Sequence, residues 1–172
     1  ARVMPMGKRT DKQAELWVPT QAMPKAPGHP FYRKLNELLA EAGFDTFVEN
    51  LARPFYAEVM GRPSIPPGVY FRMLFVGYLE GIDSQRGIAW RCSDSRSLQE
   101  FLGYLPTEET PDHSSLSRVR ERVPQVVHEE VFAFILKWAA DRGLIGGKTV
   151  AVDSTLLEAN AAMKTISRRD TG

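Results

Sequence analysis

The chain has 172 residues, of which 43% are hydrophobic and 10% aromatic, so it can bury a globular core. Its 22 basic and 21 acidic side chains leave a net charge of +1, which excludes a strongly basic domain of the kind that by itself indicates nucleic-acid binding. A single cysteine, Cys92, excludes an internal disulfide and fits a reducing cytosol. No apolar run is long enough to span a bilayer, and no secretory leader pattern occurs. We therefore expect a cytoplasmic protein with no membrane partner.

Residues 1–28 are predicted to form a flexible, basic, proline-rich arm. They contain four prolines, show no apolar periodicity, and carry more basic than acidic side chains. The basic ones are Arg2, Lys8, Arg9, Lys12 and Lys25. Folding is expected to begin at about residue 29.

Residues 29–145 are predicted to form one helical domain of about six helices. Apolar residues recur there at helical spacing, and glycine or proline stands between the periodic stretches. Seven candidate stretches could supply these helices: about residues 30–43, 45–53, 64–80, 84–92, 95–102, 112–123 and 125–142. The stretch 64–80 is apolar nearly all round, so it is the predicted central helix. Phe31 is expected on the inner face of the first helix, and Asp45 is expected to cap the second.

The helix at 112–123 is the candidate DNA reader. Helical spacing places Leu116, Val119 and Val123 inward, Ser114, Arg118 and Arg122 outward, and Arg120 at the edge of the inner face. Arg118 and Arg122 suit phosphates or guanine edges, and Ser114 suits a phosphate at the helix N-terminus. The three short helices of residues 84–123 would then be a helix-turn-helix-like segment.

A surface helix with an ordinary solvated face is the alternative interpretation of the same residues. Residues 84–123 contain six arginines and six acidic residues, so this segment has no excess charge. The loop at 103–111 is also longer than the tight turn of a standard helix-turn-helix. The residues alone leave both interpretations open.

The run KTVAVDSTLLEANAA, from Lys148 to Ala162, places one carboxylate in a predicted buried strand. An unpaired buried Asp153 would be costly, so it must be hydrogen-bonded, lie at a strand end, or bind a cation. Glu158 is an odd number of residues away and would face the other side of a continuing strand. Both a polar strand end and a metal ligand fit Asp153 on these grounds.

Three further residue types have structural interpretations. Cys92 is expected to be a buried thiol and His113 an ordinary surface histidine. Trp17, Trp90 and Trp138 are expected to be core or docking aromatics.

Two stretches together resemble insertion-sequence transposases of the IS5/IS1182 type. The run IPPGVYFRMLFVGYLEGIDSQRGIAWRCSDSRSLQEFLGY, followed by PDHSSLSRVRERV, resembles their N-terminal domain. The residues Asp153, Ser154, Thr155, Ala159 and Asn160 resemble the opening of a DDE catalytic domain. The resemblance spans about residues 30–165. It implies a mainly α protein, in which a helical DNA-binding domain precedes the first strand of a truncated RNase H-like α/β domain at 146–172.

The same resemblance implies transposition by two-metal phosphoryl transfer in the full-length protein. Asp153 would be the first ligand of Mg²⁺ (or Mn²⁺), and the remaining acidic ligands would lie beyond Gly172. This chain would then be an inactive N-terminal fragment that binds no metal. The implied partners are double-stranded DNA at the element's terminal repeats and a second copy in a homodimer, within the bacterial nucleoid. The alternative is a truncated, non-catalytic DNA-binding or dimerisation module, either a remnant or an inhibitor of transposition.

Overall fold

The computed structural model describes residues 17, 19, 28–56 and 64–143, and every regular element in them is helical. The elements are α1 (Pro30–Glu41), α2 (Phe44–Ala52), the 3-10 helix η2 (Arg53–Phe55), α3 (Pro67–Glu80), α4 (Gln85–Ser93), α5 (Arg96–Leu102), α6 (His113–Arg122) and α7 (Gln125–Asp141). The prediction of a mainly helical chain is confirmed for this part, with seven α-helices in place of about six. The predicted strand and the start of an RNase H-like domain, at 146–172, lie outside the described residues, as does most of the arm at 1–28.

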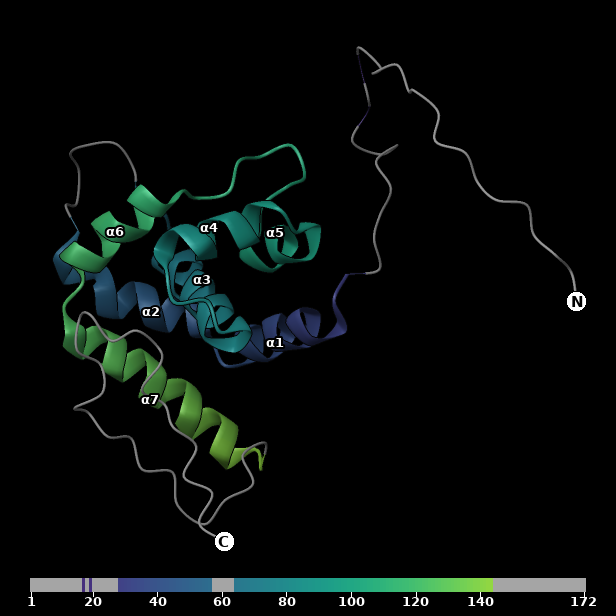
Figure 1. The fold of residues 1–172 in the computed structure, drawn as a ribbon. Helices are drawn as coiled ribbons and strands as arrows, with labels where there is room; N and C mark the ends of the chain where they lie inside the picture. The colour runs from purple at the N-terminus through teal and green to yellow at the C-terminus, as the bar shows by residue number, and fades with distance from the viewer. Residues whose placement is uncertain (1–16, 18, 20–27, 57–63, 144–172) are drawn as a thin grey trace, which may run out of the picture.

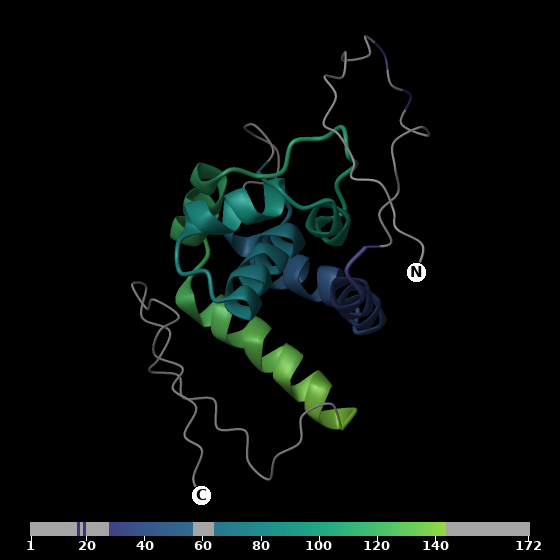
Figure 2. The ribbon, with the colours of Figure 1, turned by 45° about the vertical axis from the view of Figure 1, so that its right-hand side comes forward.

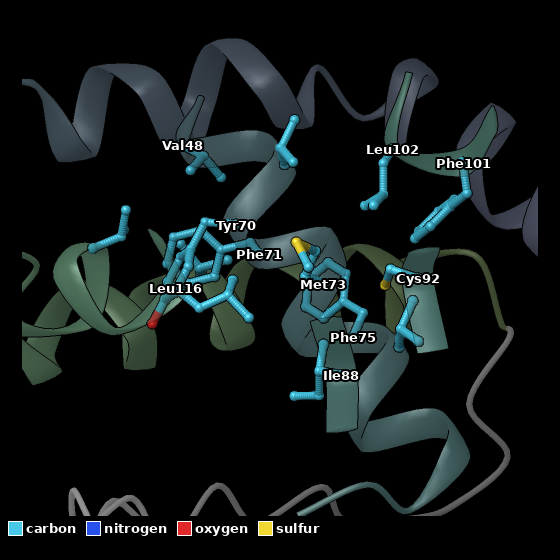
Figure 3. Packing of buried hydrophobic residues seen from close by; sticks show 14 of the residues in the cluster. Val48, Tyr70, Phe71, Met73, Phe75, Ile88, Cys92, Phe101, Leu102 and Leu116 are labelled. Atoms are coloured by element: carbon cyan, nitrogen blue, oxygen red, sulfur yellow. The ribbon is translucent and has the colours of Figure 1, made fainter. Parts of the chain in front are cut away.

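Helix α3 is the centre of the domain, as its apolar sequence predicts. Figure 1 shows it enclosed, with α4, α5 and α6 on one side and α1 and α2 on the other. Nine of its 14 residues are buried, and its side chains fill the core drawn in Figure 3. Helix α7 packs on α2 and extends away from the other helices, as Figure 2 shows most clearly.

A buried arginine joins four of these helices. Arg72, on α3, donates from Nη1 and Nη2 to the two carboxylate oxygens of Asp45, at 2.5 and 2.9 Å. Its Nε donates to Oδ1 of Asn36 at 3.1 Å. Its guanidinium carbon lies 5.4 Å from the ring centre of Phe44 and 5.9 Å from that of Phe101. One side chain of α3 therefore contacts α1, α2 and α5.

The prediction that Asp45 caps α2 is wrong. Helix α2 begins one residue earlier, at Phe44, and its N-cap is Gly43 with a φ of 65°. Glycine adopts this left-handed conformation without the steric penalty of other residues, and it reverses the chain between α1 and α2. The carboxylate of Asp45 is instead bonded to Arg72.

The prediction that Phe31 faces inward is also wrong. Phe31 is exposed, and the neighbouring Tyr32 takes the buried position on α1. The Tyr32 hydroxyl donates to Glu80 at 2.6 Å, and Arg91 donates to the same carboxylate through Nε and Nη2. Partial burial opposes ionisation of Glu80, but the bonds from Arg91 and Tyr32 outweigh it and lower the pKa of this carboxyl. This polar contact, together with the burial of Leu39, holds the Tyr32 face of α1 against the core.

The beginnings of α4, α5 and α6 follow directly from sequence. Ser84 and Ser95 accept hydrogen bonds from the backbone N–H groups of Gly87 and Leu98, three residues on. Asp112 caps α6 in the same way. Such side chains satisfy the free N–H groups of a first helical turn, so the predicted starts agree with the observed ones to within a residue.

Close packing at Gly68 predicts that Gly68→Ala destabilises the domain. An added Cβ would lie 2.1 Å from Oδ1 of Asp45 and 3.2 Å from Nη1 of Arg72, so the ion pair must move. We expect a loss of about 1–3 kcal/mol in the free energy of unfolding, measured by urea denaturation. Thr46→Ala, on the exposed face of α2, is the control. Equal denaturation midpoints for Gly68→Ala and wild type would contradict this role of the pair.

Candidate nucleic-acid interface

Helix α6 has the two faces that its sequence predicts. Leu116 and Val119 are fully buried and Val123 is 3% exposed, so these three anchor the helix to the core. Arg118, on the opposite face, is exposed to solvent. It makes no hydrogen bond, ion pair or ring contact with any other described residue. Its guanidinium is therefore available to an external anion.

The carboxylate of Asp112 already occupies the N-terminus of α6. The Asp112 carboxylate accepts a hydrogen bond from the backbone N–H of Ser115 at 2.8 Å and from the hydroxyl of Ser114 at 3.0 Å. These bonds lower the pKa of Asp112 to about 2. Ser114 thus lies at the predicted place, but its hydroxyl is directed to Asp112. An approaching phosphate would meet a negative charge at this end of the helix, so the arginines further along are the more favourable anion contacts.

The other two predicted arginines of α6 have neighbours. The guanidinium carbon of Arg122 lies 4.9 Å from the ring centre of Tyr56, a cation–π distance. Stacking leaves the N–H edge of a guanidinium free to donate. Arg120 lies near buried Tyr70 and His128. Burial raises the pKa of Tyr70, and the charge of Arg120 opposes that rise only in part. Burial lowers the pKa of His128, and the charge of Arg120 adds to this effect.

His128 joins the start of α7 to the core, and sequence reasoning missed it. Its Nε2 lies 2.9 Å from the hydroxyl of Tyr70, and its Nδ1 lies 3.0 Å from the carbonyl oxygen of Pro124. A neutral ring satisfies both contacts, because Nδ1–H donates to the carbonyl and Nε2 accepts from the hydroxyl. Burial lowers the pKa of His128 and favours this neutral form. The one available signal was its position beside Val127 on the inner face of α7.

Helix α6 packs on α4 and α3, at the end of a long connection. The hydroxyl of Ser117 is hydrogen-bonded to Oε1 of Gln85, which joins the middle of α6 to the first turn of α4. Residues 103–112 connect α5 to α6, whereas Asp94 and Ser95 alone connect α4 to α5. The three short helices are therefore present, but the tight turn among them precedes α5 and not the predicted recognition helix.

The remaining predicted side chains divide into buried and exposed ones. Cys92 is fully buried, as expected, and burial raises the pKa of its thiol to about 12. His113 is exposed, also as expected. Trp17 and Trp90 are 85% and 65% exposed, so the prediction that they are core or docked aromatics is wrong. Trp138 is half-buried on α7.

The predicted metal ligand Asp153 lies outside the described residues, so its role stays a prediction. In residues 28–56 and 64–143, no group of three His, Cys, Asp or Glu side chains is placed to hold a metal ion. No helix within those ranges is long and apolar enough to cross a membrane.

Comparison with known protein families identifies the family to which this chain belongs. The family described as Transposase domain (DUF772) matches residues 20–122, which is more than half of the chain. The chain belongs to this transposase domain family. The match ends at the last residue of α6 and includes all the helices from α1 to α6. It agrees with the resemblance to the N-terminal part of IS5/IS1182-type transposases, and it gives the chain a function related to transposition. No curated protein and no solved structure matches the chain.

The buried His128 predicts that the domain loses stability on acidification. The unfolded histidine titrates at about 6.5, and the folded one titrates lower. Between these two values the unfolded chain binds more protons, so stability falls as the pH drops below about 6.5. Thermal melts of wild type should show this fall, and His128→Gln should reduce it. His113→Gln removes an exposed histidine and should keep the full pH dependence; equal slopes for His128→Gln and wild type would contradict this origin.

Proposed function

We propose that the helices of residues 29–145 form the DNA-binding domain of an insertion-sequence transposase, with α6 facing double-stranded DNA at the element's terminal repeats. The observation that carries this proposal is the exposed, unpartnered guanidinium of Arg118 on a helix held rigidly by Leu116 and Val119. It lies within the region that matches a transposase family.

The arginines of α6 would act differently at the DNA. Arg118 is free to bind a phosphate or the O6 and N7 atoms of a guanine. Arg122, stacked on Tyr56, is preorganised and loses less conformational freedom on binding. Arg120 would reach the DNA from the edge of the inner face. Ser114 would contribute a phosphate contact only if its hydroxyl turned away from Asp112.

The competing interpretation is that α6 is an ordinary solvated surface helix. The charge of α6 helps to decide between this interpretation and DNA binding. Glu121 is the one acidic residue between His113 and Arg122, against three arginines. A helix with this excess of positive charge attracts a polyanion at low salt. The difference from the whole chain, whose charge is balanced, supports a localised DNA contact.

For catalysis we propose Asp153 as a ligand of Mg²⁺ or Mn²⁺ in the complete enzyme, on the resemblance of residues 153–160 to the DDE opening. Divalent ions of this kind supply Lewis-acid stabilisation of phosphoryl transfer when bound. A single carboxylate cannot hold two such ions, so other carboxylates must join Asp153.

A homodimer on paired element ends, in the nucleoid, completes this proposal. A non-catalytic DNA-binding or dimerisation module is the second candidate, because the described helices would serve it equally well. The reading frame after Gly172 separates the two: further acidic ligands favour the enzyme, and a genuine stop favours the module.

Substitution of Arg118 and Arg122 is expected to change DNA binding in a specific way. Arg118→Ala should weaken binding to duplex DNA and reduce the slope of log affinity against log salt by about 1, and adding Arg122→Ala should reduce it by about 2. Fluorescence anisotropy of a labelled duplex measures both. Arg118→Ala should leave the thermal melt unchanged, whereas Arg122→Ala should lose about 0.5–1 kcal/mol from the contact with Tyr56.

Lys137→Ala is the matched control for this titration. Lys137 is exposed on α7 and makes no hydrogen bond or ion pair with another described residue, so its loss removes one charge away from α6. An affinity and salt slope for Arg118→Ala equal to those of wild type would refute the proposed contact.

The isolated 172-residue chain is predicted to show no metal-dependent DNA cleavage. The reason is that Asp153 alone cannot form a two-metal site. A nicking assay on supercoiled DNA with Mn²⁺ measures this, with Asp153→Ala as the control for contaminating nuclease. Cleavage that requires Mn²⁺ and disappears in Asp153→Ala would show that these residues suffice.

A further inference from the structure

The basic side chains of the domain differ in whether they have partners. Arg72, Arg91 and Arg142 form ion pairs with carboxylates, and Arg122 stacks on Tyr56. Lys34 pairs with Glu37 of the same helix, and Arg53 of η2 donates to Asn50 of the preceding helix α2. Arg33, Arg96 and Arg120 also make interactions. Within the described residues this leaves Arg86, Arg118 and Lys137 without a hydrogen bond, ion pair or ring contact.

The two unpartnered arginines belong to neighbouring helices at one junction. Gln85 of α4 and Ser117 of α6 are hydrogen-bonded to each other. Arg86 and Arg118 are the next residues along their respective helices, and both are exposed. Figure 1 shows α4 and α6 side by side. Both unpartnered arginines are therefore one residue away from the hydrogen bond that joins α4 to α6.

An exposed tryptophan lies on the same face of α4 as Arg86. Trp90 follows Arg86 by four residues, which places the two side chains one above the other on a helix. The inner face of α4 is occupied by Ile88 and Cys92, which are 2% and 0% exposed. Trp90 is 65% exposed and stacks on no other ring of the described residues.

This face of α4 has the charge to attract a polyanion. No acidic residue lies between Gln85 and Ser93, and the second arginine of α4, Arg91, is neutralised by Glu80. The nearest acids in sequence, Asp83 and Asp94, lie beyond the two ends of the helix. Arg86 therefore supplies an uncompensated positive charge next to a large exposed aromatic ring.

We propose that Arg86 and Trp90 form a second DNA-contacting surface on α4, beside that of α6. Arg86 binds a backbone phosphate, and Trp90 packs on an adjacent sugar. This inference rests on the proposed DNA binding by α6 and extends the footprint across the α4–α6 junction.

The fluorescence of Trp90 can report its contact with DNA directly. In the variant Trp17→Phe, Trp138→Phe it is the sole tryptophan of the chain. Addition of an unlabelled mixed-sequence duplex at low salt should change the emission of Trp90 and reduce its quenching by iodide, and raising the salt should reverse both. The variant Trp17→Phe, Trp90→Phe retains Trp138 on α7, and its emission should stay unchanged.

Two substitutions separate the charged contact from the apolar one. Arg86→Ala should weaken duplex binding several-fold and reduce the salt slope by about 1. Trp90→Ala should weaken binding without changing the salt slope, because no phosphate contact is lost. Lys137→Ala is again the matched control.

The outcomes distinguish this surface from that of α6. Duplex binding by anisotropy, with emission and iodide quenching of Trp90 unchanged, would overturn this inference and leave α6 as the DNA contact. A change in Trp90 that depends on protein concentration and not on DNA would also overturn it, and would indicate self-association. A chain that binds no duplex at low salt would overturn both proposals.

Discussion

The ion pair between Arg72 and Asp45 is the contact on which the rest of the domain depends. A guanidinium in a core loses its hydration, and that cost is offset here by both Asp45 oxygens, by Asn36 and by two aromatic rings. These groups come from α1, α2 and α5, so satisfying one charge fixes the positions of three helices around α3. An apolar side chain would fill the same space without requiring any particular arrangement of its neighbours. Gly68 is part of the same arrangement, because a side chain there would clash with the carboxylate of Asp45.

The arrangement around α3 determines which charges reach solvent. Burial of α3 leaves α4 and α6 on one side of the domain, joined by Gln85 and Ser117. The contact between Tyr70 and His128 fixes the junction that follows α6. Most of the described arginines have interaction partners, and the two without one, Arg86 on α4 and Arg118 on α6, are each one residue from the bond that joins these helices. A chain of balanced net charge can thereby present a local cationic surface, which composition alone does not reveal.

Local signals predicted much of this fold, and long-range contacts account for the rest. Ser84, Ser95 and Asp112 mark helix starts because a cap bonds to backbone three residues away. The faces of α6 follow from spacing alone. The role of Asp45 depends on an arginine 27 residues away, and the buried Tyr32 has its hydrogen-bond partner in Glu80, 48 residues away. The contacts of the arginines also depend on residues far away in the sequence. The sequence therefore predicts the same role for Arg118 and Arg122, although only Arg122 stacks on Tyr56. The candidate metal ligand Asp153 lies outside the described residues and stays a prediction from resemblance.

We propose that this transposase domain binds duplex DNA through the arginines of α6. The most direct measurement is an NMR titration that follows the side-chain Nε–Hε resonances of the arginines as duplex DNA is added. We predict large shifts for Arg118 and Arg122. We predict none for Arg72, which is buried, or for Arg142, which pairs with Glu41 at the end of α7. Shifts confined to Arg142 and other residues away from α6, or no shifts at low salt, would contradict the claim.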